Sequence, residues 1–183
     1  SKKISYLFPR AHAVAYVMMA FRIAWFKVYH PLAFYAAYFS IRAKAFDLRI
    51  MTGDLKTQMT EFNRIKALDR AASPKDKDLM SALEVSMEMY QRGYRFVNVD
   101  IQHSEARRFS IKDGALLPPF LAIDSLGETV ADAIVAEREE RPFTSLKDLQ
   151  RRCKVSNTII DLMKELKCCG ELPEDEQMSL FGA

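Results

Sequence analysis

The stretch LAIDSLGETVADAIVA, residues 121–136, decides how the C-terminal half of this chain folds. Residues 120–124 are long enough for one and a half helical turns. Residues 128–140 place apolar side chains at helical spacing, which predicts a longer helix. Ser125, Leu126 and Gly127 separate the two segments, and this composition favours a tight turn. We therefore expect two short helices joined by a three-residue turn.

This pattern matches a helix-hairpin-helix motif. In that motif, backbone N–H groups at the start of the second helix hold a DNA phosphate. Small residues are needed in the turn so that the backbone can approach the anion closely. Gly127 fills the second glycine position, whereas Ser125 replaces the usual first glycine. An ordinary helical turn beside a core would explain the same residues, so the motif alone leaves both interpretations open.

Basic residues follow the motif closely. They are Arg138, Arg141, Lys147, Arg151, Arg152 and Lys154. Residues 145–170 have the length of a second, degenerate hairpin, with Thr144 and Ser156 as the expected helix caps. A tandem pair of hairpins grips duplex DNA without reading its sequence. The alternative is a solvated face in which nearby glutamates at 137, 139 and 140 neutralise the bases.

The N-terminal quarter is strongly apolar. Residues 11–29 predict a helix buried inside a protein, and Pro31 fits the first position of a second helix over 31–45. A membrane span is not expected, because charged residues interrupt the segment and a span needs about 20 apolar residues. The aromatic residues of 31–45 exceed what two helices could bury alone, so these helices need a neighbour.

The middle of the chain predicts helices over 54–71 and from Ser73 to Gly93. A short strand is expected at 94–101. Residues 107–111 and 115–117 predict a hairpin whose turn contains Asp113-Gly114. The fold class is therefore mainly α, with a small β-hairpin insert.

Charge is distributed unevenly over the 183 residues, although the formal net charge is only +3. Residues 1–50 carry eight basic residues against one acidic residue, and residues 171–183 carry four acidic residues and no base. Different parts of the chain therefore face different partners. The three cysteines are odd in number and two of them are adjacent, so they cannot form a secreted disulfide framework, which indicates a reducing cytoplasm. Packing explains adjacent Cys168 and Cys169 better than a metal site does, and no catalytic constellation is recognisable.

The acidic tail carries a short apolar motif near its end. This QMSLF motif resembles the bacterial sliding-clamp binding pentapeptide, and its residues are Gln177, Met178, Ser179, Leu180 and Phe181. The glutamine amide would anchor the peptide, while Leu180 and Phe181 would enter an apolar pocket.

Four stretches together resemble one family. FPRAHAVAYVMMAFRIAWFKVYHPLAFYAAYFSIRAKAFD (8–47), LEVSMEMYQRGYRFVNVDI (83–101), PPFLAIDSLGETVA (118–131) and QMSLF (177–181) are similar, in this order, to the PolC-type DNA polymerase III α subunit of bacteria. The resemblance implies a C-terminal fragment of a replicative polymerase. It divides the chain into the end of the fingers (1–72), a helix with short strands (73–119), a tandem helix-hairpin-helix domain (120–170) and a flexible tail (171–183). The Ser-Lys-Lys start fits such a piece.

The resemblance also implies residue roles. Arg10, His12 and Tyr16 would lie near the incoming nucleotide, although they could equally be packed polar residues. The phosphate-holding hairpin would use Ser125, Leu126, Gly127 and Thr129. Palm carboxylates that bind Mg²⁺ would belong to the parent polymerase, so this chain alone is expected to be inactive and to hold no cofactor. The implied partners are primer-template duplex, incoming dNTP, the β sliding clamp and the rest of the polymerase, in the bacterial cytoplasm near the nucleoid and without a membrane.

Two other classes remain open at this stage. One is a standalone DNA-binding adaptor with a clamp motif and no polymerase activity. The other is a helix-hairpin-helix glycosylase, for which Asp132, Lys147 and Asp148 are the candidate catalytic residues.

Overall fold

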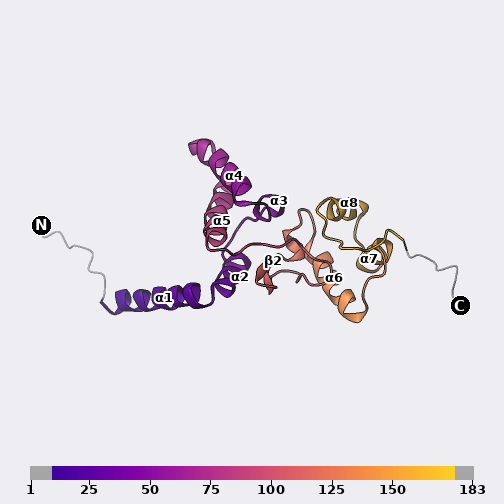
Figure 1. Ribbon diagram of the computed structural model, residues 1–183, viewed down its shortest axis with the longest axis horizontal. Helices are drawn as coiled ribbons and strands as arrows, with labels where there is room; N and C mark the ends of the chain where they lie inside the picture. Colours follow the sequence, from indigo (N-terminus) through magenta and orange to yellow (C-terminus); the bar gives the residue numbers. More distant parts are fainter. Residues whose placement is uncertain (1–9, 176–183) are drawn as a thin grey trace, which may run out of the picture.

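The computed structural model describes residues 10–175, and this part of the chain is mainly helical. One long helix, α1 (Arg10–Tyr29), projects away from the rest of the molecule (Figure 1). The other helices gather around two hydrophobic cores, one in the first half of the chain and one in the second. Phe46 packs against both cores and joins them. The predicted fold class, mainly α with a small β-hairpin, is confirmed.

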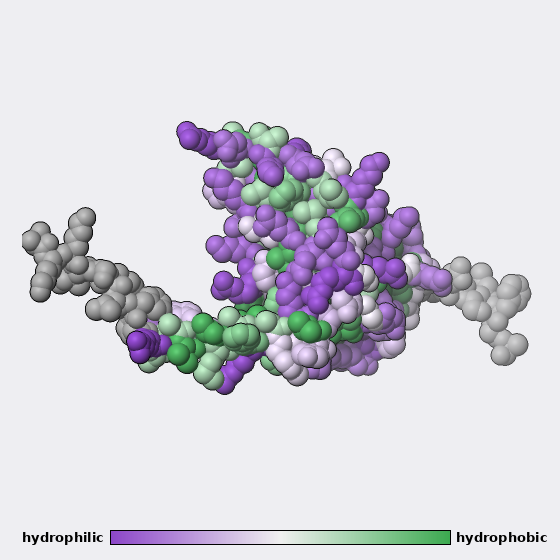
Figure 2. Space-filling model, turned by 60° about the vertical axis from the view of Figure 1, so that its left-hand side comes forward, coloured by the Kyte–Doolittle hydropathy of each residue, from purple (hydrophilic) through white to green (hydrophobic). Residues whose placement is uncertain are grey.

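Helix α1 buries none of its residues, which differs from the expected buried helix. Its apolar side chains form a continuous strip in Figure 2, and Phe21 is 73% exposed. Its C-terminal end is held, because Lys27 pairs with Glu88 at 2.6 Å and lies 5.2 Å from the centre of the Phe34 ring. Among the described helices, α1 is long and apolar enough to cross a membrane by length and composition. A helix that packs on another part of a longer protein meets the same criteria.

The first core is built from α2 (Pro31–Ile41), α3 (Leu48–Met51), α4 (Leu55–Ala67) and α5 (Pro74–Gln91). Asp54 caps α4, and Ser73 with Asp76 forms a reciprocal capping box on α5. The expected helices over 31–45 and 54–71 end earlier than predicted. In the second case a separate 3₁₀ turn, η1 (Asp69–Ala71), follows. Because α5 packs on α4, this core includes residues on both sides of position 72.

A small hairpin connects the two cores. Strands β1 (Ser110–Lys112) and β2 (Ala115–Leu117) pair antiparallel, and the predicted Asp113-Gly114 turn has positive φ at both residues. The strand predicted at 94–101 was wrong as an element, since only Phe96 makes an isolated bridge, to Leu116. The reason is that only Leu116 of β2 bonds this segment, and the Ile101 N–H donates to the Cys168 carbonyl instead.

The second core holds the predicted hairpins. It is formed by the 3₁₀ turn η2 (Phe120–Ala122), α6 (Glu128–Glu140), α7 (Leu146–Cys153) and α8 (Asn157–Glu165). Helix α6 has the predicted bounds. The cap of α7 was assigned one residue too early, because Ser145, not Thr144, accepts the N–H of Asp148 at 3.0 Å. Ser156 caps α8 as predicted.

Candidate nucleic-acid interface

The turn before α6 exposes the start of that helix. Ser125 adopts a left-handed conformation with φ 63°, Leu126 is buried in the core, and Gly127 is the N-cap. Gly127 gives α6 no side-chain cap, so the first N–H groups of the helix have no side-chain acceptor from this position. Thr129 is exposed beside them. Helix N-termini of this kind attract anions, because the unsatisfied N–H groups and the helix dipole both favour negative charge.

The turn before α8 repeats this backbone pattern. Lys154 is left-handed with φ 54°, Val155 is buried, and Ser156 is the N-cap. The N-cap residues of the two turns have nearly the same backbone angles: φ −75° and ψ 157° at Gly127, φ −71° and ψ 156° at Ser156. The two turns therefore share one order of left-handed residue, buried anchor and N-cap, which was not predicted from the sequence.

Lys44, from the first half of the chain, lies near the first hairpin turn. Residues 43–46 and 121–126 line a shallow cavity of about 300 Å³, and exposed Lys44 lies on its rim. Lys44 was absent from the predicted interface, because only the tertiary fold brings the segment after α2 beside the turn. Its position supplies a cation next to Ser125 without any signal in the local sequence.

Acidic residues at the start of α6 are already neutralised. Arg107 bonds Asp132, with its Nε at 3.1 Å from Oδ1, and it also pairs with Glu128. Side chains at all three positions are about half exposed or more. The pairing keeps two carboxylates of α6 from opposing an anion at the same helix end, so Arg107 is a second residue that sequence reasoning missed.

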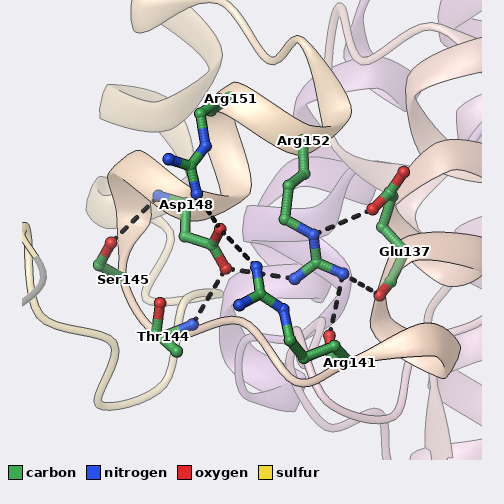
Figure 3. A network of polar contacts seen from close by, with 7 residues as sticks. All are labelled: Glu137, Arg141, Thr144, Ser145, Asp148, Arg151 and Arg152. Carbon is green, nitrogen blue, oxygen red and sulfur yellow. Dashed lines mark hydrogen bonds and ion pairs between the residues drawn. The ribbon is translucent and has the colours of Figure 1, made fainter.

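Three of the predicted DNA-binding arginines converge on one buried carboxylate (Figure 3). Asp148 has a fully buried side chain and lies 3.2 Å from Arg141, 3.0 Å from Arg151 and 3.2 Å from Arg152. The Thr144 N–H also donates to it at 3.3 Å. Burial alone would raise the pKa of Asp148, but these hydrogen bonds and the positive charges outweigh it, so the pKa is lowered.

The arginines differ in what else they contact. Side chains of Arg141 and Arg151 are 57% and 70% exposed, whereas that of Arg152 is 11% exposed. Arg138 donates to the carbonyls of Ile101 and Ser104, at 3.1 Å and 2.9 Å. Arg138 and Arg152 thus donate hydrogen bonds to acceptors within the protein. Arg141 and Arg151 instead face solvent, and the DNA contacts of all four arginines stay predictions.

The start of the predicted flexible tail is held against α7. Leu146 N–H donates to the Pro173 carbonyl at 2.8 Å, and Lys147 N–H donates to the Glu174 carbonyl at 3.2 Å. Lys147 also pairs with Asp175, and Lys164 pairs with Glu174 at 2.6 Å. These contacts satisfy N–H groups in the first turn of α7. The clamp motif, Gln177 to Phe181, lies outside the described residues.

The remaining candidates are spread over the molecule. Arg10, His12 and Tyr16 lie exposed on α1, where the His12 and Tyr16 rings are 4.5 Å apart edge to face. Each of the glycosylase candidates is paired with another residue: Asp132 with Arg107, Lys147 with Asp175, and Asp148 with three arginines. Within residues 10–175, no cluster of His, Cys, Asp and Glu could hold a metal ion.

The three thiols are buried in the second core. Burial raises the pKa of Cys153 to about 11, of Cys168 to about 12 and of Cys169 to about 11. At neutral pH these side chains stay protonated and pack as small apolar groups, as the sequence predicted for Cys168 and Cys169.

Two matched turns on one helical core define a helix-hairpin-helix protein, and residues 93–177 match the family model described as a helix-hairpin-helix motif. The chain is also similar, over nearly its whole length, to proteins named DNA polymerase III PolC-type. It is 48% identical over 180 residues to that of Caldanaerobacter subterraneus subsp. tengcongensis, covering 98% of this chain and 13% of the relative. It is 49% identical over 182 residues to that of Streptococcus suis, and 47% identical over 182 residues to that of Streptococcus pyogenes serotype M12, covering 98% of this chain and 12% of each relative.

The chain is homologous to a segment of PolC-type DNA polymerase III proteins, as the sequence resemblance implied. It spans about an eighth of the length of those relatives.

Proposed function

We propose that this chain is the part of a PolC-type polymerase that holds the primer-template duplex. The observation that carries the proposal is the pair of matched turns, in which the N-terminus of α6 lacks a side-chain cap and Lys154 lies exposed in the second turn. Lys44, Arg141 and Arg151 add exposed positive charge from neighbouring elements. Contacts of this kind reach phosphates and sugars, so the binding is independent of base sequence.

Duplex binding by the 183-residue chain tests this proposal. The affinity for duplexes of unrelated sequence is expected to be equal and to fall steeply with salt, because each neutralised phosphate releases counterions. Lys44→Ala with Lys154→Ala should weaken binding and reduce the slope of log affinity against log salt. Lys75→Ala with Lys77→Ala removes the same charge from exposed positions on α5 and is the matched control. Equal losses in both double variants would argue against an interface at the turns.

The exposed face of α1 supports a second element of the proposal. A strip of unburied apolar side chains is costly unless another protein surface covers it, and the homology to PolC-type polymerases supplies the rest of the polymerase chain as that surface. Arg10, His12 and Tyr16 would then lie near the incoming nucleotide. In a full-length relative, replacing the residue equivalent to Tyr16 by Ala should raise the KM for dNTP more than the Kd for duplex. An unchanged KM would oppose this assignment.

Tethering to the sliding clamp is the third element. It rests on the QMSLF sequence and its position after an acidic segment. A weak tail contact and a weak duplex contact on one chain give a tight attachment, because the second contact forms at high effective concentration. Leu180→Ala with Phe181→Ala should abolish capture of the bacterial clamp in a pull-down, whereas full capture by that variant would exclude the motif.

The homology to PolC-type polymerases supports the remaining parts of the proposal. The parent protein would be a cytoplasmic DNA nucleotidyltransferase whose palm carboxylates bind Mg²⁺, and the 183-residue chain would not extend a primer by itself. Primer extension by the purified chain would overturn that last expectation. A standalone adaptor is the less favoured reading, because it leaves the apolar strip of α1 without a covering surface.

A further inference from the structure

Arg152 joins the two hairpins. It lies in the last turn of α7, two residues before Lys154 of the second turn, and it reaches across to the C-terminal end of α6 (Figure 3). Its Nε donates to the Glu137 carboxylate at 2.9 Å, and its Nη2 donates to the backbone carbonyls of Glu137 and Arg141, the latter at 3.0 Å. Its Nη1 donates to Asp148 at 3.2 Å. Four of the five N–H groups of the guanidinium therefore meet protein acceptors.

These contacts leave Arg152 little capacity for a ligand. Its guanidinium carbon lies 4.7 Å from the centre of the Phe143 ring, and the side chain is 11% exposed. The two carbonyls it binds belong to the end of α6, where the helix dipole favours a cation. The Glu137 carbonyl also accepts the Arg141 N–H at 3.1 Å. Lysine could match the charge but could not reach four acceptors with one fork.

The position of Arg152 matters because each turn sits at a helix end. Helix α6 has 13 residues, which corresponds to about 20 Å between the first turn and the end that Arg152 holds. Fixing that end against the last turn of α7 fixes the spacing of the two turns. A duplex presents its phosphates at set distances, so a fixed spacing lets both turns bind one duplex without ordering the protein first.

We propose that Arg152, held by Asp148 and Glu137, is a positioning residue that sets the spacing of the two hairpin turns for duplex DNA and does not itself contact phosphate. This inference rests on the proposed duplex binding. It assigns the neighbouring arginines different work: Arg151, on the same helix and 70% exposed, acts through its charge toward DNA.

Conservative and neutral substitutions separate the two kinds of arginine. Arg152→Lys and Arg152→Gln should both reduce duplex affinity, on the order of tenfold, because each loses the bridge. Arg151→Lys should bind nearly as the wild type does, and Arg151→Gln should lose affinity with a decrease of about 0.9 in the salt slope, as for one phosphate contact. Binding is measured at a temperature at which circular dichroism shows every variant folded. Rescue of binding by Arg152→Lys would overturn the proposal.

A distance measurement adds a readout that loss of stability alone would not change. Spin labels at Ala136→Cys on α6 and Asp161→Cys on α8 occupy exposed positions away from the two hairpin turns, and the native thiols are buried. The distribution of distances between the labels should broaden in the folded Arg152→Lys protein. An unchanged distribution with weakened binding would instead make Arg152 a direct contact. Failure of the wild-type chain to bind duplex at any salt concentration would refute the proposed function, and the label distances would still test the bridge.

Discussion

The two hairpin turns share one backbone and differ in chemistry. Both place a left-handed residue, a buried apolar anchor and an N-cap in the same order. The first turn has Ser125 and Gly127, which give α6 an N-terminus without a side-chain cap. The second has Lys154 and Ser156, and the Ser156 hydroxyl accepts the Ile159 N–H at 3.4 Å. The first turn is thus suited to bind an anion through its backbone, and the second through a side chain.

This difference explains how the second turn can lack the glycines of a helix-hairpin-helix motif and still bind a DNA phosphate. A left-handed residue other than glycine costs about 1–2 kcal/mol. Both turns carry that cost, and the second replaces the backbone site with a cation at the same position. Three kinds of substitution test the difference between the two turns.

The largest effect is expected where the hairpins are linked, at Asp148. Asp148→Ala leaves three arginines without their shared carboxylate and should lower the free energy of unfolding by about 3 kcal/mol, the low end for a buried pair because two of these arginines are exposed. The folded-state pKa of Asp148 is lowered, so its contribution is complete above the ordinary carboxyl pKa of 3.8 and is lost as pH falls below that value. Urea unfolding should show the difference between wild type and Asp148→Asn shrinking in acid. A difference that does not change with pH would mean that the carboxylate charge contributes nothing.

A smaller effect is expected at the two N-caps. Gly127→Asp introduces a carboxylate that caps α6 and opposes a phosphate there, and the added side chain meets no atom within 4 Å of its Cβ. Duplex affinity should fall about tenfold, or about 1.4 kcal/mol, without loss of stability. Ser156→Asp adds the same charge to a turn that is already capped, and it should cost less affinity. Equal losses measured by fluorescence anisotropy would show that the two N-termini do not differ.

The smallest effects are expected at the left-handed positions. Ser125→Gly and Lys154→Gly should each relieve backbone strain and raise the free energy of unfolding by about 0.5 kcal/mol, less than the full strain because glycine also gains entropy in the unfolded chain. Only Lys154→Gly removes a cation, so only this variant should decrease the salt slope of duplex binding, by about 0.9. A decrease with Ser125→Gly would place the charge contribution elsewhere.

Local patterns predicted the elements whose signals are local. The helix over 128–140, the Asp113-Gly114 turn and the Ser156 cap depend on neighbouring residues, and the structure has each of them. The strand at 94–101 failed because pairing depends on a partner strand, and β2 offers only a single bridge there.

Arg151 and Arg152 were predicted together as DNA contacts, although the Arg152 side chain is 11% exposed and that of Arg151 is 70% exposed. Lys44 reaches the first turn through a tertiary contact that no spacing encodes. The backbone of the candidate site was therefore readable from sequence, whereas the roles of its charged side chains required the fold.

The reactivity of the buried cysteines reports how often the second core opens. Cys153 is the last residue of α7, and adjacent Cys168 and Cys169 follow α8. Burial keeps all three thiols protonated at neutral pH. A thiol reagent can therefore react only during excursions that expose the core and restore an ordinary thiol pKa. The rate of labelling reads out how often the hairpin domain opens, and its slowing on addition of duplex would report how firmly the DNA holds the two turns together.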